Sequence, residues 1–153
     1  MDDEIDAVLA PELITLREPP TDKGGCIEYL LDRAVDAGRV TDRDEALEAI
    51  RSHEAEMGAG VGKGIGLFHA KTDAVDRPTI AFARSSEGVA VETSDGEPAT
   101  LLFLLLAPTE ATDEHLAILS SLSRALMHAE VRTALHEAES AAAARRTLAE
   151  AIG

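Results

Sequence analysis

Residues 100–106 read Thr-Leu-Leu-Phe-Leu-Leu-Leu, a continuous apolar run without a charged side chain. A strand that covers only one face of a sheet alternates apolar and polar residues, whereas an unbroken apolar run is typical of a strand buried on both faces. Such strands lie inside sheets that have helices packed on both sides. The run therefore predicts an α/β fold with this strand in the interior of the sheet.

Shorter apolar patterns around this run complete the predicted sheet. Helical periodicity occurs before most of the predicted strands and again after residues 100–106. The sequence therefore places helices both before and after the strands. This order predicts a single α/β domain over residues 1–153, with a mixed β-sheet covered by helices on both faces. The further strands are predicted at residues 11–16, 65–70, 79–83 and 89–92, with a turn at residues 94–98.

Capping residues indicate where the helices begin and end. Thr21 or Asp22 can cap a helix that Gly38 ends, and Thr41 can cap a second helix. Thr112 can cap a third helix after the central strand, and two more helices are predicted at residues 130–139 and 141–152. The side chains expected to face the core are Ile27, Leu30, Leu31, Ala34 and Val35 of the first helix, Ala46, Leu47 and Ile50 of the second, and Leu116, Leu119, Leu122 and Leu126 of the third.

The composition is strongly acidic, with 29 Asp and Glu residues against 14 Lys and Arg and a formal net charge of −15. This charge repels nucleic acid phosphates and disfavours binding to DNA or RNA. Abundant acids with few lysines and no Asn or Gln indicate a high-salt cytoplasm, with an ordinary acidic protein from a GC-rich genome as the alternative. The acidic N-terminus lacks the basic region of a signal peptide, and no apolar run could span a bilayer. We therefore expect a cytoplasmic protein without membrane insertion.

Several kinds of reactive centre are disfavoured. Cys26 is the only cysteine and lies among apolar residues of a predicted helix, which indicates a buried structural thiol. His69, His115 and a carboxylate could form a zinc site, but no H-x-x-x-H or clustered Cys/His spacing supports one. No G-x-S-x-G elbow occurs either. Neither a cofactor nor a metal is expected.

A glycine-rich segment, Gly58-Ala-Gly-Val-Gly-Lys-Gly-Ile-Gly66, leads into a predicted strand. It is not a P-loop, because its spacing is one residue short and Gly64 stands where Ser or Thr would bind magnesium. A dinucleotide-binding loop follows a strand and opens a helix, whereas this segment follows a helix and opens a strand. Gly60, Gly62 and Gly64 instead offer exposed backbone that another molecule can approach and N–H groups that can bind an anion.

Two histidines stand where an α/β fold can hold a functional site. His69 ends the strand after the glycines. His115 follows the central strand and falls in the first turn of a predicted helix, where free N–H groups favour a neutral imidazole and nearby negative charge. A structural role is the alternative for each. The other histidines are interpreted as solvated residues on helix surfaces: His53, His128 and His136.

Read in order, these segments resemble the IIA domains of the fructose/mannitol phosphotransferase family. The family pattern around its active histidine is close to R-E-x-x-x-S-T-G-I-G-x-G-I-A-I-P-H, and the corresponding run here extends from His53-Glu54 to Phe68-His69. A later block of the family, D-G-x-P-V, an apolar strand and D-E-H-L-x-x-L-x-x-L, corresponds to residues 95–98, 101–107 and 113–122. The opening P-E-L-I and the A-G-x-V-T-D-R of residues 37–43 are also similar, so the resemblance covers nearly the whole chain.

The resemblance implies that His69 accepts a phosphoryl group from the phosphohistidine of an HPr-like phosphocarrier protein. His69 would then pass the group to a cysteine in the IIB domain of a sugar permease during fructose/mannitol-type uptake. His115 would be the second histidine near the phosphoryl group, and protein donors would stabilise the phosphoryl oxygens without a metal. The loop that meets phosphate and partner would include Gly60, Gly62, Gly64 and Glu54.

Three departures from the family pattern bear on the site: Phe68 replaces Pro, Ala59 replaces Thr, and His53 replaces Arg. The change at His53 removes a fixed positive charge. Two alternatives therefore stand beside sugar uptake. One is a regulatory, nitrogen-type IIA protein that acts by phosphorylation-dependent protein binding, and the other is a non-phosphorylated binding module of the same fold.

Overall fold

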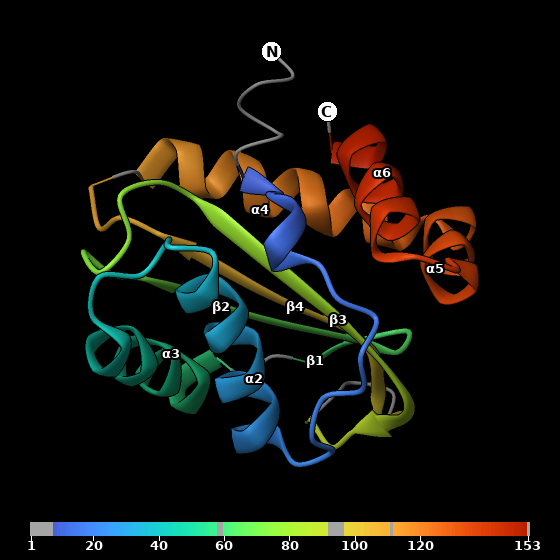
Figure 1. Cartoon of the computed structure of the whole chain (residues 1–153), viewed down its shortest axis with the longest axis horizontal. Coiled ribbons are helices and arrows are strands. Elements are labelled where there is room, and N and C mark those ends of the chain that lie inside the picture. The colour runs from blue at the N-terminus through green and yellow to red at the C-terminus, as the bar shows by residue number, and fades with distance from the viewer. Residues whose placement is uncertain (1–7, 58–59, 92–96, 111, 153) are drawn as a thin grey trace.

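The computed structural model describes residues 8–57, 60–91, 97–110 and 112–152 (Figure 1). Its centre is a 4-stranded sheet in the order β1-β2-β4-β3. The α/β class with a mixed sheet is confirmed, because β4 runs parallel to β2 and antiparallel to β3. The strands are β1 (Gly60–Gly62), β2 (Ile65–Lys71), β3 (Thr79–Val89) and β4 (Ala99–Ala107).

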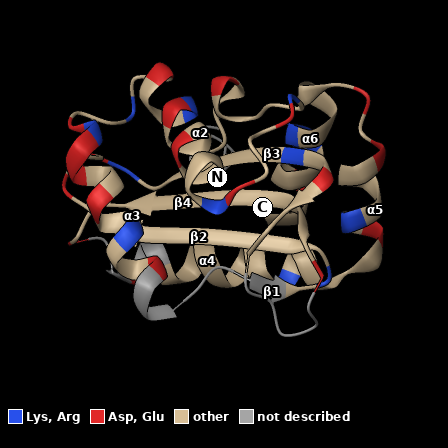
Figure 2. Ribbon diagram, turned by 90° about the horizontal axis from the view of Figure 1, so that it is seen from below, with Lys and Arg blue, Asp and Glu red and all other residues tan. Residues whose placement is uncertain are grey.

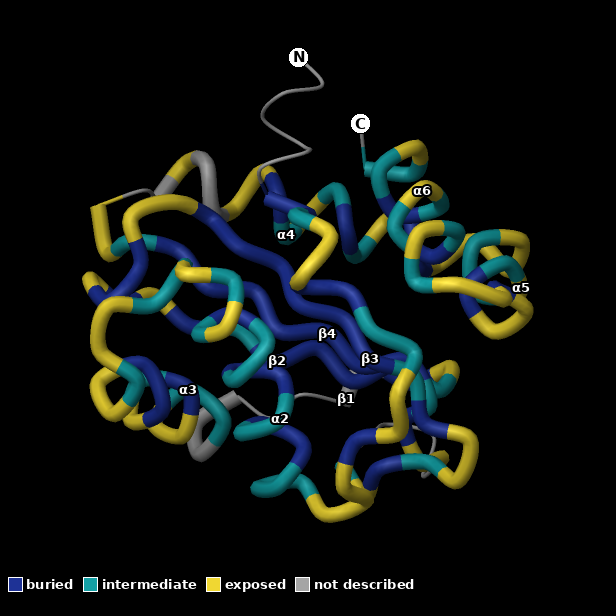
Figure 3. The backbone as a smooth tube through the Cα atoms, in the orientation of Figure 1, coloured by how far each residue is buried: buried dark blue, intermediate teal, exposed yellow. Residues whose placement is uncertain are grey.

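The apolar run at residues 100–106 forms the interior strand β4, as predicted. Its side chains alternate between two cores, one on each face of the sheet, and Figure 3 shows the strand buried along its length. Phe103 stacks against Phe82 of β3 with ring centroids 5.0 Å apart. The residues that face the first core are Leu101, Phe103 and Leu105, and those that face the second are Leu102, Leu104 and Leu106.

The helices divide between the two faces, so the predicted cover on both sides is confirmed. α2 (Lys23–Asp36) and α3 (Arg43–Met57) pack on one face. The other face carries the short 3-10 helix η1 (Pro11–Leu13), α4 (Thr112–Met127), α5 (Ala129–Glu137) and α6 (Ala141–Ile152). Figure 2 shows acidic residues recurring along α2 and α3, whereas β2 and β4 are almost free of charge.

Helix α2 begins and ends as predicted. The Asp22 carboxylate caps it by accepting a hydrogen bond of 2.7 Å from the backbone N–H of Gly25. Gly38 follows the helix with φ of 75°, a left-handed conformation that glycine adopts without a steric penalty. The buried residues of its inner face are Cys26, Ile27, Leu30, Leu31 and Ala34.

The predicted cap of α3 is wrong by one residue. The Thr41 hydroxyl donates to the Ala74 carbonyl at 3.1 Å instead of capping the helix. The Asp42 carboxylate takes that role and accepts from the N–H of Glu45 at 3.1 Å. Thr41 is drawn away because its own N–H also bonds to Ala74, which ties it to the loop after β2.

The strand predicted at residues 11–16 is also wrong. Pro11 opens the 3-10 helix η1, which suits proline because the first helical position needs no N–H donor. Leu13 is fully buried in the core below this turn. Only Ile14 pairs with the sheet, in an isolated bridge to Phe82. Burial of Leu13 thus outweighs the strand pattern.

The strand predicted at residues 79–83 is confirmed as part of β3, which continues to Val89. The strand predicted at residues 89–92 is wrong, because Ala90 and Val91 lie beyond the end of β3, and Glu92 lies outside the described residues. The sequence pattern breaks at Arg84, but its guanidinium Nη1 donates to three carbonyls at the end of α5, those of Leu135, His136 and Ala138, at 2.8–2.9 Å. Carbonyls at a helix end lack partners within the helix, so this charged residue is satisfied inside the strand. Residues 92–96, which include most of the predicted turn, lie outside the described residues.

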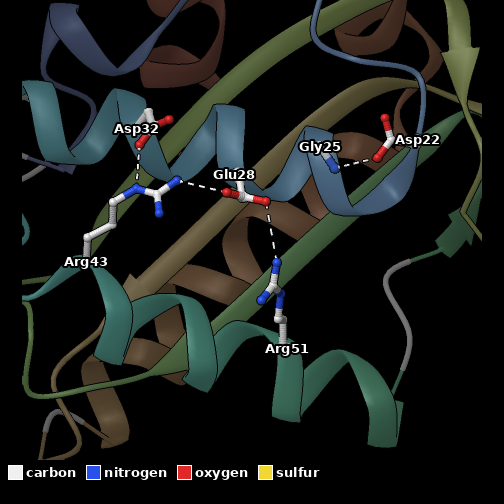
Figure 4. Close-up of polar contacts among 6 residues, drawn as sticks. All are labelled: Asp22, Gly25, Glu28, Asp32, Arg43 and Arg51. Carbon is white, nitrogen blue, oxygen red and sulfur yellow. Dashed lines mark hydrogen bonds and ion pairs between the residues drawn. The ribbon is translucent and has the colours of Figure 1, made fainter.

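Ion pairs join α2 to α3 along their outer sides (Figure 4). Arg43 donates to Asp32 at 2.8 Å and to Glu28 at 3.1 Å, and Arg51 reaches Glu28 at 3.4 Å. The hydrogen bonds to Asp32 and Glu28 raise the pKa of Arg43 above its usual value. These pairs connect the two helices at the surface, and each exposed pair contributes little stability individually.

The predicted burial of Cys26 is confirmed. Its thiol is fully buried under α2, and burial, with a smaller contribution from Asp22, raises its pKa to about 12. The helices within the described part of the chain are all too short or too polar to cross a membrane.

Candidate functional site

His69 lies near the carboxyl end of β2, at the edge of the sheet. Within the described residues, β1 pairs only with Ile65 and Gly66 at the other end of β2, so the half of the strand that carries His69 has β4 on one side alone. Phe68, its neighbour, points into the core below α2 and α3. The His69 ring is half-buried at this open edge.

His53 of α3 contacts His69 directly. The two Nε2 atoms are 3.1 Å apart, the ring centroids are 4.0 Å apart, and the ring planes are inclined by 57°. The interpretation of His53 as a solvated surface residue is wrong, because its side chain is half-buried against His69. The alignment with the family's Arg was the signal in the sequence that could have identified this residue. His128 and His136 are exposed, as predicted.

An open pocket of about 480 Å³ surrounds the two rings. It lies where α3, the carboxyl half of β2 and the start of α4 meet, and both histidines are part of its wall. Lys71 of β2 adds a positive charge to this wall, which can attract an anionic group. The lining residues are Ala49, Ser52, His53, His69, Ala70, Lys71, Leu116 and Leu119.

Leu116 departs from its predicted role in the core. It is 54% exposed at the pocket, whereas Leu122 and Leu126 of the same helix are buried as predicted and Leu119 is half-buried. The first turn of α4 extends past the core, so the leucine repeat continues beyond the surface that the sheet can cover. An exposed leucine beside His69 offers an apolar contact for another molecule.

His115 precedes Leu116 in the first turn of α4, which begins at Thr112. The side chains of Thr112 and His115 lie outside the described residues. The backbone nevertheless brings this turn to the pocket, since Leu116 and Leu119 both line it. The expectation that His115 acts near His69 remains a prediction.

The Glu54 carboxylate forms an ion pair with Lys23, the first residue of α2, at 3.0 Å. It lies next to His53 on α3 but does not line the pocket. Only 9% of its side chain is exposed, so the pair is largely shielded on the Glu54 side. This contact holds the end of α3 that carries His53 against α2.

The glycines lie at the other end of β2 from His69. Gly62, Lys63 and Gly64 have positive φ values of 84°, 59° and 77° and form the turn of the β1–β2 hairpin. The Gly64 carbonyl accepts from the N–H groups of Thr100 and Leu101. Five residues of an extended strand span about 16 Å, so the turn at Gly64 is remote from the His69 ring. Gly60 pairs with Gly66, closer to His69, and Ala59 lies outside the described residues.

This arrangement suits nucleophilic chemistry on a transferable group. A neutral imidazole is a competent nucleophile, and a second imidazole within hydrogen-bond distance can orient it. Among the described residues, no group of three His, Cys, Asp or Glu side chains is positioned to hold a metal ion. The described residues of the pocket wall thus offer two imidazoles, one ammonium, the Ser52 hydroxyl and an apolar surface.

Comparisons with known proteins agree with this arrangement. The profile described as "Phosphoenolpyruvate-dependent sugar phosphotransferase system, EIIA 2" matches residues 7–151. The chain is 54% identical to the "PTS system fructose-specific EIIA component" of Haloferax volcanii, over 97% of each protein. It is 40% identical, over 90% of its length, to the "PTS system fructose-specific EIIABC component" of Bacillus subtilis, of which it covers 22%.

A solved structure supports the same assignment. The nitrogen regulatory protein IIA-Ntr from Neisseria meningitidis superposes with a TM-score of 0.86 and 28% identity, over 94% of this chain and 98% of that one. The high-salt habitat predicted from the acidic composition fits the Haloferax relative. The match of sequence over nearly the full length, together with the shared fold, leads to one conclusion. The chain belongs to the EIIA 2 family of the phosphoenolpyruvate-dependent sugar phosphotransferase system, a family of phosphotransferases.

Proposed function

We propose that this protein is the EIIA phosphocarrier of a fructose-type uptake system and that His69 carries the phosphoryl group. The observation that carries the proposal is the position of His69 in an open pocket at the sheet edge, with a second imidazole 3.1 Å away. The 54% identity to a fructose-specific component favours fructose over other sugars.

In this proposal, Nε2 of His69 attacks the phosphorus of a phosphohistidine on an HPr-like protein. Nε2 is the ring nitrogen farthest from the backbone, so a partner protein can reach it more readily than Nδ1. The P–N bond of the donor breaks as the new P–N bond forms, and the donor nitrogen keeps the electron pair. The reaction needs alignment of the two rings and stabilisation of the phosphoryl oxygens. Lys71 and His53 supply positive charge and an N–H donor beside the pocket, and His115 is expected to add another.

The second half-reaction passes the group to a cysteine thiolate of a IIB domain. The name of the Bacillus subtilis relative includes A, B and C components in one chain, which supports a IIB partner for this protein. Leu116 and Leu119 form the apolar part of the rim on which either partner would dock. Both partners would meet His69 at the same open edge, so they would bind in turn.

Two of the three departures from the family pattern are compatible with phosphorylation. Phe68 replaces a proline, but its ring is 2% exposed and points into the core below α2 and α3, away from the pocket. His53 replaces an arginine, and its Nε2 lies 3.1 Å from Nε2 of His69, where an imidazole nitrogen can serve as an N–H donor. The proposal of a non-phosphorylated binding module therefore loses the support of Phe68.

The regulatory, nitrogen-type role is the second candidate, and the structural similarity to IIA-Ntr favours it. The two roles share the chemistry at His69 and differ in the acceptor. A neighbouring gene for a IIB or IIC component would favour transport.

The experiment is phosphoryl transfer in a purified system at high salt. Phosphoenolpyruvate, Enzyme I and the cognate HPr are incubated with the protein, and then with the IIB domain of the organism's fructose permease. We expect label on this protein and its passage to the IIB cysteine, and no label on the His69→Ala variant. Label that stays on the protein in the presence of IIB would favour the regulatory role, and absence of label with active HPr would favour the binding module.

A further inference from the structure

The contact between His53 and His69 constrains where their protons lie. Two nitrogen atoms at 3.1 Å form a hydrogen bond only if one carries a proton and the other offers a lone pair. His69 needs the lone pair on Nε2 to attack phosphorus. The proton of this bond therefore belongs on Nε2 of His53 when the protein is ready to react.

The charged residues near His53 belong to four elements, β2, α2, α3 and α4. β2 contributes Lys71, besides His69, to the same pocket wall. On α3 itself, the neighbouring Glu54 is paired with Lys23 of α2. α4 presents the apolar side chains of Leu116 and Leu119, and its first turn also carries Asp113, Glu114 and His115.

We propose that His53 is a positioning residue that makes phosphorylation of His69 dependent on pH, an inference that rests on the proposed function. In the unphosphorylated protein, Nε2–H of His53 donates to Nε2 of His69 and orients the ring. When phosphorus bonds to that nitrogen, this hydrogen bond breaks and the same N–H turns to a phosphoryl oxygen. No proton leaves His53 in this step, and the open pocket gives the ring room to turn.

The strength of the new bond depends on the charge of His53. An imidazolium donor adds a Coulomb attraction to the anionic phosphoryl oxygens that a neutral imidazole donor lacks. Imidazole gains its second proton between about pH 8 and pH 5, whereas a guanidinium keeps its charge over this range. The phosphorylated form should therefore be favoured more at low pH than at high pH, and an arginine at this position would remove the dependence.

Three proteins separate this effect from other titrations: the wild type, His53→Arg and His53→Gln. Arg is a donor that stays charged, and Gln is a donor that stays neutral. The equilibrium occupancy of phosphate on His69 is measured against one HPr donor from about pH 5.5 to about pH 9. His69, His115, the phosphoryl group and HPr titrate in all three reactions, so the ratios between the proteins isolate residue 53.

We expect His53→Arg to exceed His53→Gln in the phosphorylation equilibrium constant by roughly tenfold at every pH. The wild type should match His53→Arg near the acidic end and His53→Gln near the alkaline end. If the equilibrium constant of the wild type varies with pH in parallel with those of both variants, the inference is overturned. The same substitutions at His128, which is exposed and pairs with Glu130 at 3.7 Å, serve as controls. They should leave the phosphorylation equilibrium constant and its pH dependence unchanged.

A second measurement needs no substitution. ¹⁵N chemical shifts of the imidazoles in the unphosphorylated wild type should show a protonated Nε2 on His53 and an unprotonated Nε2 on His69 near neutral pH. The opposite assignment would overturn the inference. If the wild type takes no phosphate on His69, the proposed function fails as well. If it takes phosphate but all three proteins share one pH profile, only this inference fails.

Discussion

Nζ of Lys23 lies 3.0 Å from Oε1 of Glu54, so an ion pair joins the first residue of α2 to the residue after His53 on α3. The Glu54 side chain is 9% exposed and that of Lys23 is 37% exposed. A carboxylate this close to the interior needs its partner, because an unpaired buried charge is costly. The pair thus links the orientation of His53 to the start of α2.

Replacing Lys23 by Met should slow phosphoryl acceptance several-fold, because the end of α3 that carries His53 loses its anchor. We expect a loss of about 1 kcal/mol in the free energy of unfolding, since Lys23 is partly solvated. Stopped-flow transfer from phospho-HPr and urea denaturation measure the two effects. Arg51→Met is the control, since it removes a more exposed ion pair of α3 with α2, and it should leave transfer unchanged. Normal transfer in Lys23→Met would contradict the anchoring role.

Leu116→Ser should weaken docking of the partner without destabilising the fold. Leu116 is 54% exposed at the pocket, so its replacement should change the free energy of unfolding by less than about 0.5 kcal/mol. We expect the KM for phospho-HPr to rise about tenfold, with kcat nearly unchanged, because an apolar contact at the centre of an interface contributes on the order of 1–2 kcal/mol. Met127→Ser, 47% exposed at the other end of α4, is the matched control. Equal effects of the two variants would exclude Leu116 as part of the docking surface.

His115→Ala should slow phosphoryl transfer more than it lowers stability. The residue belongs to the first turn of α4, which reaches the pocket through Leu116 rather than the core. Removing one stabilising donor typically costs about 100-fold in rate. Single-turnover kinetics and thermal unfolding, measured together, test this expectation. Normal transfer combined with a large loss of stability would show that His115 has a structural role.

Cys26 should resist alkylation in the native protein and react once the protein unfolds. Burial raises its pKa from 9.0 to about 12, so the thiol stays protonated at neutral pH. The same shift adds stability below pH 9, and this stability is lost as the pH rises from 9 towards 12, because only the unfolded chain loses the proton readily. Iodoacetamide labelling with and without denaturant tests the first expectation. The free energy of unfolding of the wild type and of Cys26→Ala, measured between these pH values, tests the second. Rapid native labelling would refute the burial argument.

Patterns dominated by burial could be predicted from the sequence. The apolar run at residues 100–106 is typical of an interior strand, and the inner faces of α2 and α3 follow from periodicity. The conformation of short segments could not be predicted reliably from the sequence, because tertiary contacts determine it. Residues 11–16 match a strand, yet burial of Leu13 after Pro11 produces a 3-10 turn. Thr41 and Asp42 are both good caps, and a hydrogen bond from Thr41 to the distant Ala74 leaves the role to Asp42.

The site could be predicted only in part for a similar reason. His69 follows from the resemblance and from its place in a strand, whereas its contact with His53 depends on how α3 lies along β2. No local pattern indicates that packing. The glycines precede His69 closely in the sequence, yet most of the seven-residue strand β2 separates their turn from the His69 ring. Nearness in sequence there does not produce nearness in space.

The central claim is that His69 carries the phosphoryl group. The most direct test is to phosphorylate the wild-type protein with phosphoenolpyruvate, Enzyme I and cognate HPr at high salt, and to map the site by mass spectrometry under non-acidic conditions. We predict phosphate on His69 and none on His53, His128 or His136. Phosphate on another histidine, or none at all in the presence of active HPr, would contradict the claim.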